Sequence, residues 1–159
     1  MADSLANDIE VIRAGPSAYP WILDSFRKRL IDNDVPPPLA SVYVQAMSRM
    51  LIQSAARAVL AVPIDHEDDY AGWAVHASSG VLFAYVRKPF RRNGIATKML
   101  ATITESAPIG VAFWTRNAQA ISDHGFPIFH DLKSFENVLA FCRMDRPTYR
   151  RQETPWLSK

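Results

Sequence analysis

The sequence predicts a single α/β domain, built from a mixed, mostly antiparallel sheet flanked by helices. Three observations support this class. The length of 159 residues suits one domain, and Pro36-Pro37-Pro38 is the only strong break in the chain. The spacing of apolar residues changes along the chain, from the helical repeat to short continuous runs that are typical of strands. Two β-rich segments on either side of Ser78-Ser79-Gly80 predict an antiparallel hairpin at the centre of the domain.

Helices are predicted where apolar residues recur at every third or fourth position. In the first of them Ile22, Phe26 and Leu30 are four residues apart, and Ser17 is placed to cap the start. A similar apolar stripe occurs later in the chain, formed by Ile95, Met99, Leu100 and Ile103. The predicted helices cover residues 18–32, 39–56, 93–105 and 117–124.

Strands are predicted from short apolar or β-branched runs that end at proline or glycine. Pro63 and Pro89 end two of these runs, and Gly15 with Pro16 ends the first. The predicted strands cover residues 9–12, 57–62, 70–77, 81–87, 109–114 and 137–144, with a further short strand around 127–130. The predicted order is therefore β-α-α-β-β-β-α-β-α-β, which indicates a mixed α/β domain with a sheet covered by helices.

Composition excludes several classes of protein. An apolar fraction of 48% is too high for a disordered chain, and no apolar run approaches the roughly 20 residues that span a bilayer. The polar first residues do not resemble a signal peptide, so we expect a cytoplasmic protein without a membrane partner. A net charge of +2 does not indicate nucleic-acid binding by the whole surface. Cys142 stands alone in an apolar run, which predicts a reduced core thiol and neither a disulfide nor a metal site.

One basic turn carries the chemical information. A strand ends at Pro89, the basic pair Arg91-Arg92 follows, and a helix begins near Gly94 and Ala96, which keep the backbone free of bulk. Unpaired N–H groups at a helix start, together with the positive end of the helix dipole, favour a phosphate group. The turn therefore predicts a binding site for a phosphorylated cofactor.

The pattern Arg91-x-x-Gly94-x-Ala96 resembles the coenzyme A motif of the GNAT superfamily of N-acetyltransferases. A second segment, Asn117-x-x-Ala120 followed by Gly125-Phe126, is similar to a later segment of that family. The resemblance covers most of residues 9–144, and it is especially close to small GNAT-like proteins encoded by bacteriophages. It implies one acyl-CoA-binding domain over residues 1–159, with a core at 9–144 and a basic tail at 145–159.

The resemblance also implies a reaction, the transfer of an acetyl or similar group from acyl-CoA to a primary amine by direct attack in a ternary complex. Tyr85 and Val86 would meet the pantetheine arm and the thioester, and the basic turn would hold the pyrophosphate. The residues it implies for cofactor binding are Tyr85, Val86, Arg91, Arg92, Asn93, Gly94, Ile95, Ala96, Thr97 and Asn117.

The groups that move protons are less defined. The family often has a tyrosine one turn before the Gly-Phe pair, and no tyrosine stands there in this sequence. His124 and Ser122 are the candidates for the general acid. His76 is the candidate base because a histidine titrates near neutral pH, although a strand-end histidine in contact with solvent fits the same pattern.

Two other functions are compatible with the sequence. Without the helix tyrosine, the chain could be a catalytically silent GNAT-fold module that binds a partner. The phage resemblance and the basic tail are instead compatible with acylation of an amine on modified DNA or on a nucleic-acid-bound protein, in the host cytoplasm. The amine acceptor, small or macromolecular, is not defined by the sequence.

Overall fold

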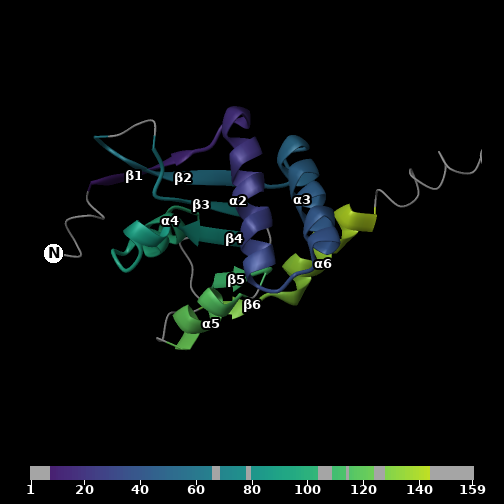
Figure 1. Cartoon of the computed structure of the whole chain (residues 1–159). Helices are drawn as coiled ribbons and strands as arrows, with labels where there is room; N and C mark the ends of the chain where they lie inside the picture. Colours follow the sequence, from purple (N-terminus) through teal and green to yellow (C-terminus); the bar gives the residue numbers. More distant parts are fainter. Residues whose placement is uncertain are drawn as a thin grey trace, which may run out of the picture.

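The computed structural model describes residues 8–65, 69–77, 80–103, 109–113, 115–123 and 128–143. Helices and strands follow one another in the order that the sequence predicts up to residue 130 (Figure 1). The elements are β1 (Ile9–Arg13), η1 (Pro16–Ala18), α2 (Tyr19–Asp32), α3 (Pro37–Ile52), β2 (Arg57–Pro63), β3 (Gly72–Ala77), β4 (Gly80–Val86), η2 (Lys88–Phe90), α4 (Ile95–Ile103), β5 (Ile109–Val111), α5 (Arg116–Asp123), β6 (Ile128–His130) and α6 (Leu132–Arg143).

The described strands form one six-stranded sheet in chain order, from β1 to β6. The first four are antiparallel, whereas β5 and β6 run parallel to β4. Helices α2, α3 and α6 pack on one face, with α2 beside α3 (Figure 1), and α4 covers the other face. This confirms the predicted class, an α/β domain with a mixed and mostly antiparallel sheet between helices.

Aromatic side chains fill the core under α2. Phe26 is fully buried, with its ring centroid 5.1 Å from that of Phe83 and 5.4 Å from that of Phe113. Trp73 stacks on Phe83 at 5.5 Å, and its indole N–H donates to Ser25 Oγ at 2.9 Å. The predicted stripe of α2 therefore faces the sheet. Because edge-to-face rings attract beyond their buried area, this cluster fixes the position of α2 over β4.

The face under α4 is packed with smaller side chains, which let the helix lie close to the sheet. Ile95 and Met99 of α4 are buried against Val59 and Ala74. Gly72 is a point of close approach, since a Cβ atom there would lie 2.5 Å from the backbone oxygen of Tyr85. A glycine at this position lets β3 and β4 pair next to the site described below.

The last segment corrects the sequence prediction, because residues 137–143 belong to helix α6 and not to a strand. The continuous apolar run Val138–Cys142 does not distinguish a buried strand from a helix. The Asp131 carboxylate decides it, since it accepts the backbone N–H groups of Lys133 at 3.1 Å and Ser134 at 3.3 Å and so caps a helix. Cys142 is half-buried on this helix and packs at the edge of the core, with its Sγ 3.9 Å from the carbonyl oxygen of Val42.

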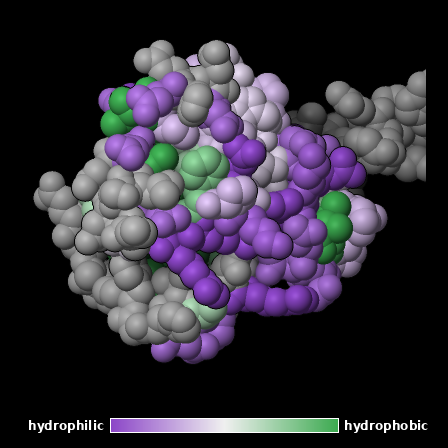
Figure 2. Space-filling model, turned by 60° about the vertical axis from the view of Figure 1, so that its left-hand side comes forward, coloured by the Kyte–Doolittle hydropathy of each residue, from purple (hydrophilic) through white to green (hydrophobic). Residues whose placement is uncertain are grey.

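One face of the described structure is largely polar. Figure 2 shows hydrophilic residues over much of the coloured part of this face, with hydrophobic residues exposed in small separate areas. Among the described residues, no helix combines the length and apolar character needed to cross a bilayer. Ser17 does not cap α2 as predicted, because it lies within η1 and α2 follows Ala18 without a side-chain cap. The remaining differences from the predicted elements are at boundaries, such as β5, which ends at Val111 and not at residue 114.

Candidate functional site

The sheet opens between β4 and β5. The two strands pair at Val81 and Val111, and two further bonds join Ala112 N to Val81 O at 2.8 Å and Phe113 N to Leu82 O at 3.2 Å. The described pairing between them stops there, whereas β4 stays paired with β3 up to Val86. From Ala84 onward, one edge of β4 therefore faces a gap.

The register shows which backbone groups face this gap. The backbone N–H of Arg87 donates to Ala71 O at 2.8 Å, so the backbone N–H of Arg87 points toward the β3 side. Residues alternate in direction along an antiparallel pair, which turns the backbone of Tyr85 toward β3 and those of Ala84 and Val86 toward the gap. The Val86 carbonyl there accepts Arg91 Nε at 2.9 Å. Tyr85 thus contributes its side chain to the site, while Ala84 and Val86 offer backbone groups.

The basic turn lies at the open end of the gap. Arg92 and Gly94 have left-handed backbones, with φ of 65° and 76°. Asn93 Nδ2 donates to the carbonyls of Phe90 at 3.2 Å and Arg91 at 3.1 Å, which holds the turn. Helix α4 begins directly after it, at Ile95. Left-handed residues of this kind bring successive N–H groups to one side, and the helix start adds its positive dipole end.

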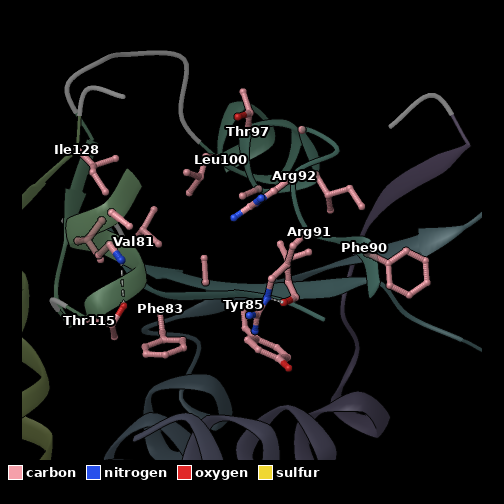
Figure 3. Close-up of a pocket in the computed structure, with 18 of the residues that line it drawn as sticks. Val81, Phe83, Tyr85, Phe90, Arg91, Arg92, Thr97, Leu100, Thr115 and Ile128 are labelled. Atoms are coloured by element: carbon pink, nitrogen blue, oxygen red, sulfur yellow. Dashed lines mark hydrogen bonds between the residues drawn. The ribbon is translucent and has the colours of Figure 1, made fainter. Parts of the chain in front are cut away.

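A pocket of about 750 Å³ joins the basic turn to the gap (Figure 3). Eight of the residues predicted to bind the cofactor line it: Tyr85, Val86, Arg91, Arg92, Gly94, Ile95, Ala96 and Thr97. Apolar and aromatic residues that the sequence analysis does not single out line the rest, among them Phe83, Leu100, Val111, Phe113, Ala118 and Ile128. Their signal in the sequence is weak, since they have the spacing of ordinary core residues.

The donors and charges of this pocket fit coenzyme A. Arg91 and Arg92 are the only charged residues among those that line it, and both belong to the turn. Two guanidinium groups and a helix start suit a pyrophosphate. The remaining walls are largely apolar, and the free edge of β4 offers N–H and C=O groups to an extended amide chain such as the pantetheine arm. The residues present therefore match the cofactor that the sequence motif implies.

Helix α5 borders the pocket and is anchored to the turn between α2 and α3. Thr115 Oγ1 caps it by accepting Ala118 N at 3.1 Å, and Arg116 N donates to Asn33 Oδ1 at 3.3 Å. The Arg116 guanidinium also forms an ion pair with Asp34. The two segments lie some 80 residues apart in sequence, so this link fixes one wall of the pocket in a way that local sequence does not reveal.

Several predicted site residues lie away from the described pocket. Asn93 is in the turn but does not line the pocket, and its role is to hold the turn. Ser122 is on α5 and does not line it either. Asn117 is also on α5, and its side chain lies outside the described residues, as does His124. The catalytic and binding roles of these residues stay predictions.

Tyr85 joins the pocket to helix α2. Its hydroxyl accepts a hydrogen bond from Arg29 Nη1 at 2.5 Å, and the Arg29 guanidinium lies 4.6 Å from the ring centroid. Arg29 Nε is 3.3 Å from the Asp32 carboxylate. The Arg91 guanidinium lies 5.6 Å from the centroid of the same ring. The sequence analysis did not identify Arg29, because its partner is 56 residues away.

His76 lies at the hairpin end of the sheet, away from the open end of the gap. Its cross-strand neighbours are Arg57 on β2 and Val81 on β4, and it does not line the pocket. Burial lowers the pKa of His76 from its usual value near 6.5, and the charges of Arg57 and Arg13 lower it further. The structure therefore does not bring the predicted base and the predicted cofactor residues together.

This lowered pKa predicts how stability depends on pH. The unfolded His76 takes up a proton at a higher pH than the folded one, so the unfolded state binds more protons below about pH 6.5 and stability falls as pH drops. Replacing His76→Gln should therefore reduce the loss of unfolding free energy between about pH 7.5 and about pH 5. Urea unfolding of both proteins at the two pH values measures this loss of unfolding free energy. Arg57→Gln should give an intermediate loss, and identical pH dependence of wild type and His76→Gln would contradict the assignment.

Comparison with known proteins gives a distant match. No protein-family model and no curated protein matches the sequence. Among the solved structures that match, one from Desulfovibrio desulfuricans is named for the GNAT family of acetyltransferases, with 20% identity and a TM-score of 0.41 over 60% of this chain and 62% of the other. A structure from Clostridium difficile 630, named a possible acetyltransferase, has 15% identity and a TM-score of 0.45 over 77% and 76%. The chain thus spans about three fifths of the length of the first of these neighbours.

Proposed function

We propose that this protein is an acyl-CoA-dependent acyltransferase that moves an acetyl or similar group to a primary amine. The observation that carries the proposal is the gap between β4 and β5, with the basic turn at its open end and the free edge of β4 along its side. Arg91, Arg92 and the start of α4 would hold the pyrophosphate, and the edge residues Ala84 and Val86 would pair with the arm.

The residues that line the pocket support transfer of the acyl group directly from the thioester to the amine. Backbone pairing along β4 orients an extended arm, so the thioester end would lie where β4 and β5 converge, near Phe83 and Phe113. Both rings are almost fully buried and are supported from behind by Phe26. A thioester there would be screened from water by apolar walls, which favours attack by an amine over hydrolysis.

One observation favours a second function, a silent module of the same fold. Neither a carboxylate nor an imidazole is among the residues that line the described pocket, so the usual groups that take a proton from an amine are missing from this set. Such a module would bind the cofactor or a related ligand without turnover. The phage resemblance and the nucleic-acid role of the tail stay predictions, because residues 144–159 lie outside the described chain.

Calorimetry and turnover together test these functions. We expect acetyl-CoA to bind with a dissociation constant in the micromolar range, about −8 kcal/mol, and ATP at the same concentration to bind far more weakly. Release of free thiol from acetyl-CoA is then measured over a panel of amines. Amine-dependent release supports the transferase, binding without release supports the module, and the absence of heat with millimolar acetyl-CoA contradicts both.

A further inference from the structure

We propose that the Arg91 side chain selects which acyl donor enters the gap, because it occupies the Val86 carbonyl until the phosphates of a ligand bind it instead. This inference rests on the proposed function and names the class of donor: a thioester whose arm carries a pyrophosphate, and not the same arm without phosphates. Its basis is the hydrogen bond that Arg91 Nε donates to the Val86 carbonyl oxygen at 2.9 Å.

This hydrogen bond lies where the ligand arm would pair. Val86 is the last residue of β4, and its backbone groups face the gap because the N–H of Arg87 points to the β3 side. The Arg91 guanidinium is 5.6 Å from the centroid of the Tyr85 ring, so the side chain lies back along the end of the strand (Figure 3). It therefore takes the place that an amide N–H of the arm needs in order to reach the same oxygen.

Arg92, the next residue, does not make such a contact. Both arginines are exposed in the same turn, and both line the pocket. Among the described contacts none joins Arg92 to β4, and Figure 3 shows its side chain pointing away from Tyr85. The turn thus carries one arginine that is bonded to the strand edge and one that is not.

The charge of the ligand decides whether Arg91 leaves the Val86 oxygen. A neutral arm would replace a hydrogen bond from a cation with one between two neutral groups, which is weaker. A pyrophosphate offers the guanidinium anionic oxygens in the two-pronged geometry that suits arginine, and such a pair is stronger than a bond to a carbonyl. Binding of the phosphates therefore frees the edge of β4, and the two parts of the ligand should bind cooperatively.

Pantetheine, which is the arm without phosphates, tests this selection by NMR titration. In Arg91→Ala the Val86 oxygen is available, so pantetheine should bind about threefold to tenfold more tightly than to wild type, as one hydrogen bond allows. By calorimetry the same variant should bind acetyl-CoA at least about tenfold more weakly, because it loses a contact to the phosphates. One substitution should thus change the two affinities in opposite directions, which partial unfolding cannot do.

Arg92→Ala is the matched control, since it removes the same side chain from the next position of the turn. It should also weaken acetyl-CoA binding, and it should leave the affinity for pantetheine as in wild type. If Arg91→Ala binds pantetheine no better than wild type, or if Arg92→Ala gains as much affinity for it, the proposal is overturned.

Inorganic pyrophosphate tests the release of Arg91 in the unaltered protein. Added to wild type, it should tighten pantetheine binding by about threefold to tenfold, whereas sodium chloride at the same ionic strength should not. In Arg91→Ala this effect of pyrophosphate should disappear. Wild type without this coupling would contradict the role of Arg91 alone. Absence of acetyl-CoA binding by wild type would remove the proposed function itself, so the two failures are distinct.

Discussion

Gly94→Trp is expected to weaken binding of acetyl-CoA at least about a hundredfold. Gly94 has a φ of 76° and lines the pocket at the start of α4. A side chain there strains the left-handed backbone by roughly 1–2 kcal/mol, and an indole would fill the space that the phosphates need. Calorimetry measures the loss, with thermal unfolding recorded beside it to show that the variant folds.

Gly15→Trp provides the control for this variant. Gly15 precedes η1 with a φ of −88°, and a Cβ built there meets no atom within 4 Å. This substitution adds the same bulk on the surface, so acetyl-CoA should bind as it does to wild type. If Gly94→Trp folds and binds as well as Gly15→Trp, the basic turn does not hold the cofactor.

Phe26→Ala is expected to cost about 3–5 kcal/mol of unfolding free energy, a large share of the roughly 5–15 kcal/mol that holds a domain of this size. The Phe26 ring is fully buried among Trp73, Phe83 and Phe113, and its loss leaves a cavity that rigid strands cannot close. Urea unfolding, followed by tryptophan fluorescence, measures the change.

The control for Phe26 is Phe129 on β6, whose side chain is 45% exposed. Phe129→Ala removes the same atoms from a position where much of the ring already meets water, so we expect a loss below about 1.5 kcal/mol. Equal losses in the two variants would show that α2 is not held on the sheet by the aromatic cluster. Because Phe83 and Phe113 also line the pocket, Phe26→Ala should weaken acetyl-CoA binding in the fraction that stays folded.

Those parts of the fold that depend on local spacing were predictable from the sequence. Ile22, Phe26 and Leu30 follow the helical repeat, and all three are buried in α2. The basic turn was equally predictable, because the proline before it and Gly94 within it restrict the backbone directly. Helix α6 was not, since a continuous apolar run lacks a period and its capping residue, Asp131, precedes the run.

Features of the site that depend on packing were not predictable. The gap exists because β5 pairs with only the first residues of β4, and no residue type marks where that pairing ends. The contact between Arg29 and Tyr85 depends on the exact placement of α2 over β4, which the buried rings decide. His76 was assigned to the reaction from its titration range. The register pairs it with Val81, at the end of β4 that lies opposite the basic turn.

The open edge of β4 also has a consequence for association between molecules. A strand with unpaired N–H and C=O groups is a template for a strand from another chain, and natural proteins protect such edges from aggregation. Here the edge lies inside the sheet, along the gap between β4 and β5, and the Arg91 side chain donates a hydrogen bond to one of its carbonyls, that of Val86. A ligand arm that pairs with Ala84 and Val86 would act as a short extra strand. Binding would then complete this part of the described sheet and leave fewer free backbone groups on β4 for a strand of another molecule.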